Sequence, residues 1–317
     1  MKLKLIALRT LVVTIVVATF CACGTVYKVP VTGRKQRLVV NDSEVLSLSF
    51  QQYNQYMQTA KLSTNATQTE MVKRVGQRIA NAVTSYLSTN GYTSELANYQ
   101  WEFNLVADGQ ANAWCLPGGK IVVYEGILPL TQTEAGLAVV MGHEVAHAVA
   151  KHSAEQMSSK YKAQYGGQIL TSVLSSAGAS SAAVTGASTL YSIGSSLTQL
   201  HYSRSNESEA DHMGLVFTAM AGYNPNEAIS FWQRMSERGS TSTPEFLSTH
   251  PSDEKRVKEI EKHLPDAMKY YNAAIGAATT TTTSSSTSKK TKTTNSQTTK
   301  TTKSTKSGTG GYTIGGK

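Results

Sequence analysis

His143-Glu144-Val145-Ala146-His147 is the stretch of this 317-residue chain that predicts most about its fold. It is an H-E-x-x-H pattern within an apolar stretch that is typical of one helix over residues 131–158. Side chains four residues apart lie on the same face of a helix, so His143 and His147 can bind one metal ion. Glu144 then lies beside the ion, where its carboxylate can take a proton from water. The pattern predicts a catalytic zinc site.

The residues around the motif predict that this helix is buried. Thr131 and Glu134 have the spacing of a capping box at a helix start, and most positions after them are small or apolar. A helix that is apolar over most of its surface is a buried helix. The alternative, two histidines and a glutamate on a solvated face, fits this context poorly. Because buried polar groups need partners, a metal ion is expected beside the histidines.

A third metal ligand is expected about sixty residues downstream. Glu207 and Asp211 are four residues apart, so they share one helix face. Glu207 is expected to bind the metal, and Asp211 to accept a hydrogen bond from a ligand histidine. The alternative is a solvated acidic helix start, which the helix dipole would also favour. Glu209 points elsewhere on this helix and is expected to be a surface charge.

The remaining histidines and Cys115 give no sign of a role in catalysis. His152 is five positions after His147, a spacing that rotates it off the metal face, so it is expected at the surface. His212 is expected to be a solvated histidine rather than a fourth ligand. Cys115 has no activating neighbours in the sequence, so we interpret it as a small hydrophobic residue.

The overall pattern predicts one mainly α-helical domain with a small β-sheet. A strand is expected over 101–107 and a hairpin over 112–125, with its turn at Pro117-Gly118-Gly119. Residues 163–200 carry no charge, and we interpret them as a mobile helical flap over the active-site cleft, with a membrane-dipping segment as the alternative. Besides the active-site helix, helices are expected over 43–60, 69–88, 206–221, 225–238 and 252–263.

The net charge of +9 does not indicate nucleic-acid binding. Seven of the basic residues are lysines in the segment 279–317, and three lie in the first ten residues, which leaves about −1 for the rest. The central region therefore has no basic stripe. The segment 279–317 is mostly Thr, Ser and Lys, so it is expected to be a disordered tail that acts as a spacer.

The first residues resemble a signal peptide. Lys2, Lys4 and Arg9 precede an apolar run over residues 11–20, which is too short for a confident membrane span. Cys23 follows a small residue and is the expected lipidation site, in preference to Cys21. Residues 1–22 are therefore interpreted as a lipoprotein signal peptide, 23–278 as the catalytic domain and 279–317 as the tail. A lipid at Cys23 would anchor the protein to a membrane face.

Several separated motifs in a fixed order resemble one family, the zinc metallopeptidases of the HtpX, CAAX prenyl protease and BepA-like group. The H-E-x-x-H helix is followed by S-R-x-x-E-x-x-A-D from Ser203 to Asp211. The segment 112–126 resembles the family's hairpin before the catalytic helix, and 29–36 resembles the start of its bacterial lipoprotein members. Thr249-His250-Pro251, with Arg256 after it, resembles the downstream His-Pro motif. Together the resemblance covers roughly residues 25–265.

The resemblance implies a zincin-like domain that binds one zinc ion per chain and cleaves peptide bonds. It implies that substrate pairs with the strand at Asn112 and Ala113, and that His250 can approach the zinc and restrain activity, unless His250 merely packs in a loop. It also suggests an outer-membrane lipoprotein that faces the periplasm and degrades misfolded envelope proteins. The alternatives are a latent zinc-bound chaperone or assembly factor and a metal-binding lipoprotein without catalysis.

Overall fold

The computed structural model of the chain describes residues 24–175, 197, 202–241, 244–250 and 254–287. The signal peptide expected over 1–22, the lipidation site expected at Cys23 and most of the flap expected over 163–200 lie outside these residues. The chain divides into two units, Met1–Gly276 and Ala277–Lys317. The first unit carries every residue discussed below as part of the site.

The described part of the chain is mainly helical with two small sheets, which confirms the expected fold class. Its elements, in order, are β1 Thr25–Lys28, β2 Lys35–Leu38, α2 Asp42–Thr59, α3 Ala66–Thr89, η1 Thr93–Asn98, β3 Glu102–Val106, β4 Ala113–Leu116, β5 Lys120–Tyr124, η2 Glu125–Ile127, α4 Leu128–Thr131, α5 Glu134–Val149, α6 His152–Ser175, α8 Arg204–Met220, α9 Glu227–Thr241, α10 Glu245–Thr249 and α11 Glu254–Thr287. No helix among the described residues combines the length and apolar character that crossing a membrane requires.

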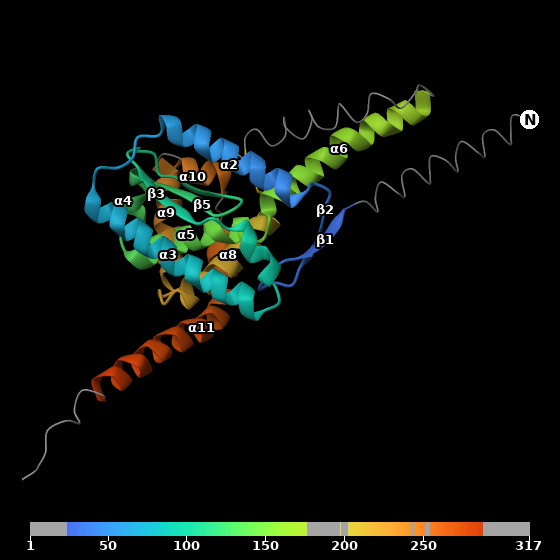
Figure 1. The fold of residues 1–317 in the computed structure, drawn as a ribbon. Helices are drawn as coiled ribbons and strands as arrows, with labels where there is room; N and C mark the ends of the chain where they lie inside the picture. Colours follow the sequence, from blue (N-terminus) through green and yellow to red (C-terminus); the bar gives the residue numbers. More distant parts are fainter. Residues whose placement is uncertain (1–23, 176–196, 198–201, 242–243, 251–253, 288–317) are drawn as a thin grey trace, which may run out of the picture. The chain divides into compact units, whose positions relative to one another are not determined.

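The larger sheet is mixed and has the strand order β3-β5-β4. β5 pairs in parallel with β3 and antiparallel with β4, and β4 forms one edge of the sheet. The turn between β4 and β5 needs glycine at Gly118 and Gly119, which have φ angles of +92° and +85°. α3 packs against β3 and α5 against β4, so α5 lies between the sheet and α8 near the centre of the domain (Figure 1).

The helix expected over 131–158 is two helices, and that prediction was wrong in its bounds. α5 begins after Thr133, whose hydroxyl accepts from the Gly136 N–H at 2.9 Å, rather than after Thr131. It ends at Val149, and α6 begins at His152. Between them Lys151 has a φ of +57°, in the left-handed region that interrupts a right-handed helix. The break changes the direction of the chain directly after the H-E-x-x-H motif.

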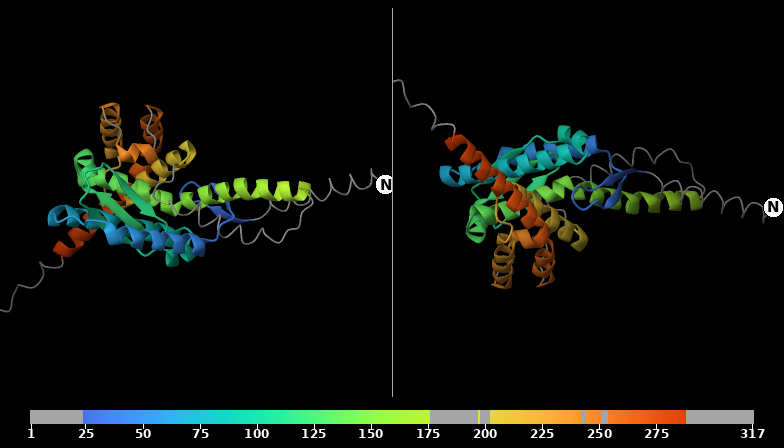
Figure 2. Two further views of the ribbon diagram at one scale, coloured as in Figure 1. Left: turned by 90° about the horizontal axis from the view of Figure 1, so that it is seen from above. Right: turned by 90° about the horizontal axis from the view of Figure 1, so that it is seen from below.

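Side chains from other elements fix this break in place. The Gln36 amide donates to the Ala150 carbonyl at 2.6 Å, which satisfies an acceptor at the end of α5. The Lys151 ammonium lies 2.6 Å from the Asp42 carboxylate and 2.8 Å from the Glu95 carboxylate. The β1–β2 hairpin that carries Gln36 lies beside the start of α6 (Figure 2).

α5 and α8 pack at very short range because each has a glycine at the crossing. A Cβ on Gly214 of α8 would lie 2.9 Å from the backbone nitrogen of His143, and a Cβ on Gly142 would lie 2.9 Å from the Gly214 carbonyl oxygen. Real side chains do not approach so closely, so only glycine fits at both positions. The contact brings the backbone of α8 directly against the metal-binding part of α5.

The C-terminal helix differs from the prediction in length. A helix was expected over 252–263, but α11 runs from Glu254 to Thr287 and contains Pro265. Residues 279–287 of the expected disordered tail are therefore helical, and residues 288–317 lie outside the described residues. The first turn of α11 carries Arg256, which is buried.

Candidate active site

His143 and His147 lie one turn apart on α5, and their rings face one another. Their Nε2 atoms are 3.1 Å apart, and both side chains are buried. The Nδ1 atom of each ring faces a different polar group, described below. The two Nε2 atoms point toward one position, as metal ligands do, while both Nδ1 atoms contact other polar groups.

Glu207 of α8 completes this group from the opposite side. Its Oε2 atom lies 3.4 Å from His143 Nε2, and its Oε1 atom lies 3.4 Å from His147 Nε2. α8 begins with a capping box between Ser203 and Asn206, which sets its first turn and therefore the position of Glu207. Burial alone would raise the pKa of Glu207, but the neighbouring His250, His143 and His147 hold it well below the ordinary value.

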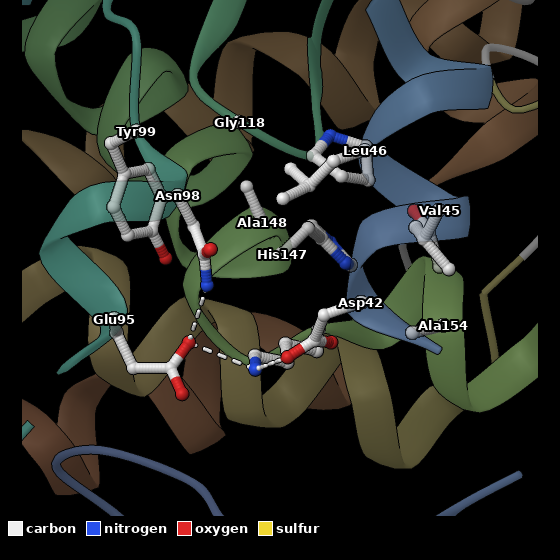
Figure 3. Close-up of a pocket in the computed structure, with 13 residues that line it drawn as sticks. Asp42, Val45, Leu46, Glu95, Asn98, Tyr99, Gly118, His147, Ala148 and Ala154 are labelled. Carbon is white, nitrogen blue, oxygen red and sulfur yellow. Dashed lines mark hydrogen bonds and ion pairs between the residues drawn. The ribbon is translucent and has the colours of Figure 1, made fainter. Parts of the chain in front are cut away.

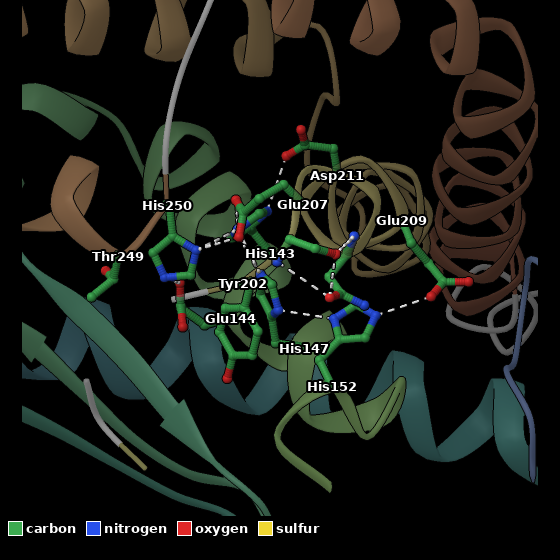
Figure 4. A network of polar contacts seen from close by, with 12 residues as sticks. His143, Glu144, His147, His152, Tyr202, Glu207, Glu209, Asp211, Thr249 and His250 are labelled. Atoms are coloured by element: carbon green, nitrogen blue, oxygen red, sulfur yellow. Dashed lines mark hydrogen bonds and ion pairs between the residues drawn. The ribbon is translucent and has the colours of Figure 1, made fainter. Parts of the chain in front are cut away.

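His250, at the end of α10, is the fourth member of the cluster (Figure 4). Its Nδ1 atom is 3.0 Å from Glu207 Oε1 and 3.2 Å from His143 Nε2. One ligand atom from each of the four side chains lies within 4.8 Å of the others. His250 therefore lies beside the two histidines of α5 and Glu207, and its expected role in restraining activity stays a prediction.

The donor set fits a zinc ion. Two imidazoles and a carboxylate are ligands of catalytic zinc sites, and His250 stands where a fourth ligand would be. Glu207 Oε2 and Glu144 Oε1 are buried and accept no hydrogen bond, although an Arg256 nitrogen lies 3.1 Å from Glu207 Oε2. Because a buried negative charge is costly, a cation at the centre of the cluster would stabilise the Glu207 carboxylate.

Glu144 lies beside the cluster on α5, and its Oε1 atom is 3.3 Å from His250 Nε2. Burial raises the pKa of this carboxyl to about 7, although the nearby His250 and the backbone N–H of Cys115 act in the opposite direction. The Cys115 thiol is itself buried, and burial raises its pKa well above the ordinary value. A carboxyl with a pKa near 7 is suited to exchange protons at neutral pH.

Asp211 lies one turn beyond Glu207 on α8 and contacts the outer side of His143. Its Oδ1 atom accepts from His143 Nδ1 at 3.0 Å. Arg256 holds Asp211 with two hydrogen bonds, from Nε at 2.8 Å and from Nη2 at 2.9 Å. The guanidinium also lies 3.4 Å above the ring of Trp232. Asp211 therefore has the geometry of an outer carboxylate that orients a ligand histidine.

Two residues expected at the surface are buried next to the cluster, so these predictions were wrong. His152 places Nδ1 2.9 Å from His147 Nδ1 and Nε2 3.0 Å from Glu209 Oε2. Glu209 also contacts Arg34. On a continuous helix His152 would point away from the metal, but the break at Lys151 turns it back. The H-E-x-x-H spacing gave no signal of this break.

Tyr202 and the remaining histidines were not assigned to the site from the sequence. The Tyr202 ring stacks on His147, with ring centroids 4.0 Å apart, and its hydroxyl is 3.0 Å from Ser153 Oγ. His212, expected to be solvated, is only partly buried and stacks on His263 with ring centroids 3.9 Å apart. Tyr202 therefore covers one face of a ligand, whereas His212 belongs to a separate ring pair.

Edge strand β4 lies beside Glu144. The Asn112 carbonyl accepts from the Tyr124 N–H of β5 at 3.0 Å, so it points into the sheet. Successive carbonyls of a strand point in opposite directions, so the Ala113 carbonyl points to the open edge. The Cys115 backbone N–H, on the same side as that of Ala113, interacts with Glu144. The open edge of β4 therefore faces the cluster.

A pocket adjoins His147 on the side of the β4–β5 turn (Figure 3). Its walls are largely apolar and include Leu46, Pro117 and Ala154. Asp42 and Glu95 flank the Lys151 ammonium at its rim. The pocket therefore offers an apolar surface between the end of the edge strand and a residue of the cluster.

The family follows from a comparison with known proteins. The model of peptidase family M48 matches residues 65–264, which include α5, α8 and the segment with His250. The chain belongs to peptidase family M48. This confirms the resemblance inferred from the sequence, and with it the expected zinc cofactor, because M48 peptidases use zinc. The four-residue cluster described above is the part of the M48 domain that fits this ion.

Relatives of this M48 peptidase come from mitochondria and from bacteria. Mitochondrial metalloendopeptidase OMA1 of Schizosaccharomyces pombe is 33% identical over 177 residues, which are 55% of this chain and 50% of that protein. Metalloendopeptidase OMA1 of Bos taurus is 31% identical over 245 residues, 76% of this chain and 46% of that protein. A putative beta-barrel assembly-enhancing protease of Vibrio cholerae is 31% identical over 160 residues, 50% of this chain and 33% of that protein. The chain spans about half or less of the length of these relatives.

Proposed function

We propose that the protein is a zinc-dependent endopeptidase of the cell envelope, with zinc held by His143, His147 and Glu207. The observation that carries this proposal is the convergence of two Nε2 atoms and one carboxylate on a point beside Glu144. When bound there, zinc supplies a Lewis acid that lowers the pKa of water and stabilises negative charge on a carbonyl oxygen.

In this proposal Glu144 is the general base and then the general acid. Its carboxylate takes a proton from the attacking water and passes it to the leaving amine of the cleaved peptide bond. The Oε1 atom accepts no hydrogen bond in the structure, so it is available for this transfer. Asp211 keeps the proton of His143 on Nδ1, so that Nε2 is left for the metal.

The substrate is proposed to be an unfolded polypeptide that pairs with β4. The outward Ala113 carbonyl offers a backbone acceptor at the edge that faces Glu144, and the Asn112 side chain lies beside it, where its Oδ1 atom accepts from the Ala113 N–H at 2.9 Å. Pairing through backbone hydrogen bonds tolerates many sequences, which suits misfolded or unassembled envelope proteins. A lipid on Cys23 would hold the enzyme at the outer membrane, facing the periplasm. One relative is named a beta-barrel assembly-enhancing protease, which agrees with an envelope role.

A latent form, in which the protein acts as a zinc-bound chaperone or assembly factor, is the second candidate. Two observations favour it. His250 lies within hydrogen-bond distance of Glu207 and close to Glu144. The same segment is tied to the substrate edge, because the Phe246 N–H donates to the Ala111 carbonyl at 3.0 Å. In a latent enzyme these contacts would exclude substrate until the segment moves.

The two candidates are separated by cleavage of an unfolded protein such as reduced casein by the purified full chain, with zinc content measured in parallel. We expect wild type to cleave, Glu144→Gln to be inactive, and both to carry about one zinc ion per chain. If the enzyme is latent, His250→Ala should cleave faster than wild type. Loss of zinc in Glu144→Gln would contradict the role assigned to this residue. Zinc retention without cleavage by wild type or His250→Ala would favour the chaperone.

A further inference from the structure

The outer side of His147 is connected to a chain of buried polar groups that the proposed mechanism does not use. His147 Nδ1 is 2.9 Å from His152 Nδ1, and His152 Nε2 is 3.0 Å from Glu209 Oε2. His152 is fully buried, and the Glu209 side chain is only 7% exposed. Buried polar groups in a continuous series of hydrogen bonds hold one another in a single arrangement.

Glu209, at the far end of this series of hydrogen bonds, is held by the loop between β1 and β2. Thr32 donates its hydroxyl hydrogen to Glu209 Oε1 at 2.5 Å, and Arg34 Nε donates to Glu209 Oε2 at 2.8 Å. Both residues lie in the segment 29–36, which resembles the start of the bacterial lipoprotein members of the family. Two backbone hydrogen bonds close the loop: the Val29 N–H donates to the Arg34 carbonyl at 2.8 Å, and the Gly33 N–H donates to the Val29 carbonyl at 2.9 Å. It therefore presents Thr32 and Arg34 together.

The donors and acceptors in this series determine which ring nitrogens of His152 and His147 carry a hydrogen. The Glu209 carboxylate only accepts, so His152 Nε2 carries a hydrogen. In a neutral imidazole that carries its hydrogen on Nε2, the Nδ1 atom is an acceptor. His147 must then donate from Nδ1, which leaves its Nε2 lone pair for the metal. This series of hydrogen bonds thus selects the tautomer of His147 that can bind zinc.

We propose that His152 and Glu209, held by Thr32 and Arg34, are positioning residues that fix the tautomer and orientation of His147 for zinc. The N-terminal hairpin is then part of the metal site, although none of its residues touches the metal position. The arrangement matches that of His143, which is oriented by Asp211 and in turn by Arg256. This inference rests on the proposed zinc site.

The test compares two substitutions that each remove one carboxylate from Arg34. Glu209→Ala breaks the series of hydrogen bonds to His147. Glu155→Ala removes the other carboxylate partner of Arg34, which lies 2.7 Å from the guanidinium and accepts a hydrogen bond from the Asn206 side chain at 3.0 Å. A third variant, His152→Phe, keeps a ring in the buried site without its nitrogen atoms. Zinc affinity is measured on the full chain by chelator competition, and folding is checked by thermal unfolding of the zinc-free proteins. The Co²⁺-substituted proteins give an absorption spectrum that reports ligand geometry.

We expect Glu209→Ala and His152→Phe to bind zinc roughly 10- to 100-fold more weakly and to change the Co²⁺ spectrum. Glu155→Ala should stay close to wild type in both measurements. Equal losses in Glu209→Ala and Glu155→Ala would mean that Arg34 only stabilises the fold, and the proposal would be overturned. Wild-type affinity in His152→Phe would overturn it as well, and this variant decides the matter if Glu209→Ala does not fold. If the wild-type protein took up no zinc, the proposed function itself would be wrong. If wild type bound zinc and cleaved protein, and the variants bound zinc as tightly as wild type, only the positioning role would be refuted.

Discussion

Burial sets the protonation of Glu144 in the zinc-free protein. Its pKa is raised from 4.5 to about 7, so the folded state binds this proton more tightly than the unfolded state does. The favourable contribution is complete below pH 4.5 and is lost as the pH rises to about 7. At roughly 1.4 kcal/mol per unit of pKa shift, this amounts to about 3 kcal/mol. Wild type should therefore lose about that much stability relative to Glu144→Gln between pH 4.5 and pH 8.

Urea unfolding of the zinc-free proteins at the two pH values measures this difference. Glu70→Gln is the matched control, because Glu70 is an exposed residue on the surface of α3. Its pH dependence should follow that of wild type. Equal pH dependence of wild type and Glu144→Gln would show that the carboxyl is not held in a desolvated position, and the argument for Glu144 as a tuned proton carrier would lose its basis.

The close packing of α5 against α8 sets the distance between the proposed ligand atoms of His143 and Glu207. In Gly214→Ala the new Cβ would lie 2.9 Å from the His143 nitrogen and 3.0 Å from its Cα atom. Backbone atoms cannot move aside singly, so the helices must separate, at a cost of about 1–3 kcal/mol. Separation also moves Glu207 away from His143. We therefore expect Gly214→Ala to unfold at a lower urea concentration and to bind zinc more weakly than wild type.

Gly109→Ala is the control for this substitution, since a Cβ at Gly109 would have no heavy atom within 4 Å. It should leave both zinc affinity and unfolding unchanged. If Gly214→Ala matched Gly109→Ala in both measurements, the close approach of the two helices would not be what places Glu207.

The active-site helix shows what the sequence could predict and what it could not. Its apolar content correctly predicted a buried helix, because local composition determines whether a helix can face water. Its end could not be predicted, because the break at Lys151 depends on partners far away in the sequence: Gln36, Asp42 and Glu95. A residue with a left-handed φ that is not glycine leaves no pattern in the sequence itself.

The same distinction applies to the site. Residues with helical spacing, His143 with His147 and Glu207 with Asp211, were expected to lie on shared faces, and the structure places them so. His152 was misplaced because its position depends on the helix break. Glu209 was misplaced because its partners, Thr32 and Arg34, lie about 175 residues away along the chain, where no local periodicity connects them to α8.

The cluster joins parts of the domain that are distant in the sequence. α5 and α8 supply the proposed ligands, and His250 directly follows α10. Two arginines that are distant in the sequence stabilise the outer carboxylates, Glu209 and Asp211. Arg34 lies before α2 and holds Glu209, whereas Arg256 lies in α11 and holds Asp211. Both of these outer carboxylates therefore have an arginine beside them, which offsets the cost of burying their charge. The cluster therefore links elements that are distant in the sequence.

A metal bound at such a link should stabilise the whole domain. A ligand that binds only the folded state adds about 4 kcal/mol when its free concentration is a thousand times its Kd. We expect chelation of zinc to lower the Tm of the full chain, and re-addition to restore it. His147→Gln should lose most of this response. His212→Gln should keep it, because His212 stacks on His263 and is not a member of the four-residue cluster. If zinc removal lowered the Tm of His147→Gln as much as that of wild type, the stabilising ion would be bound elsewhere. Replacing a ligand of the ion must weaken its binding and therefore reduce the change in Tm.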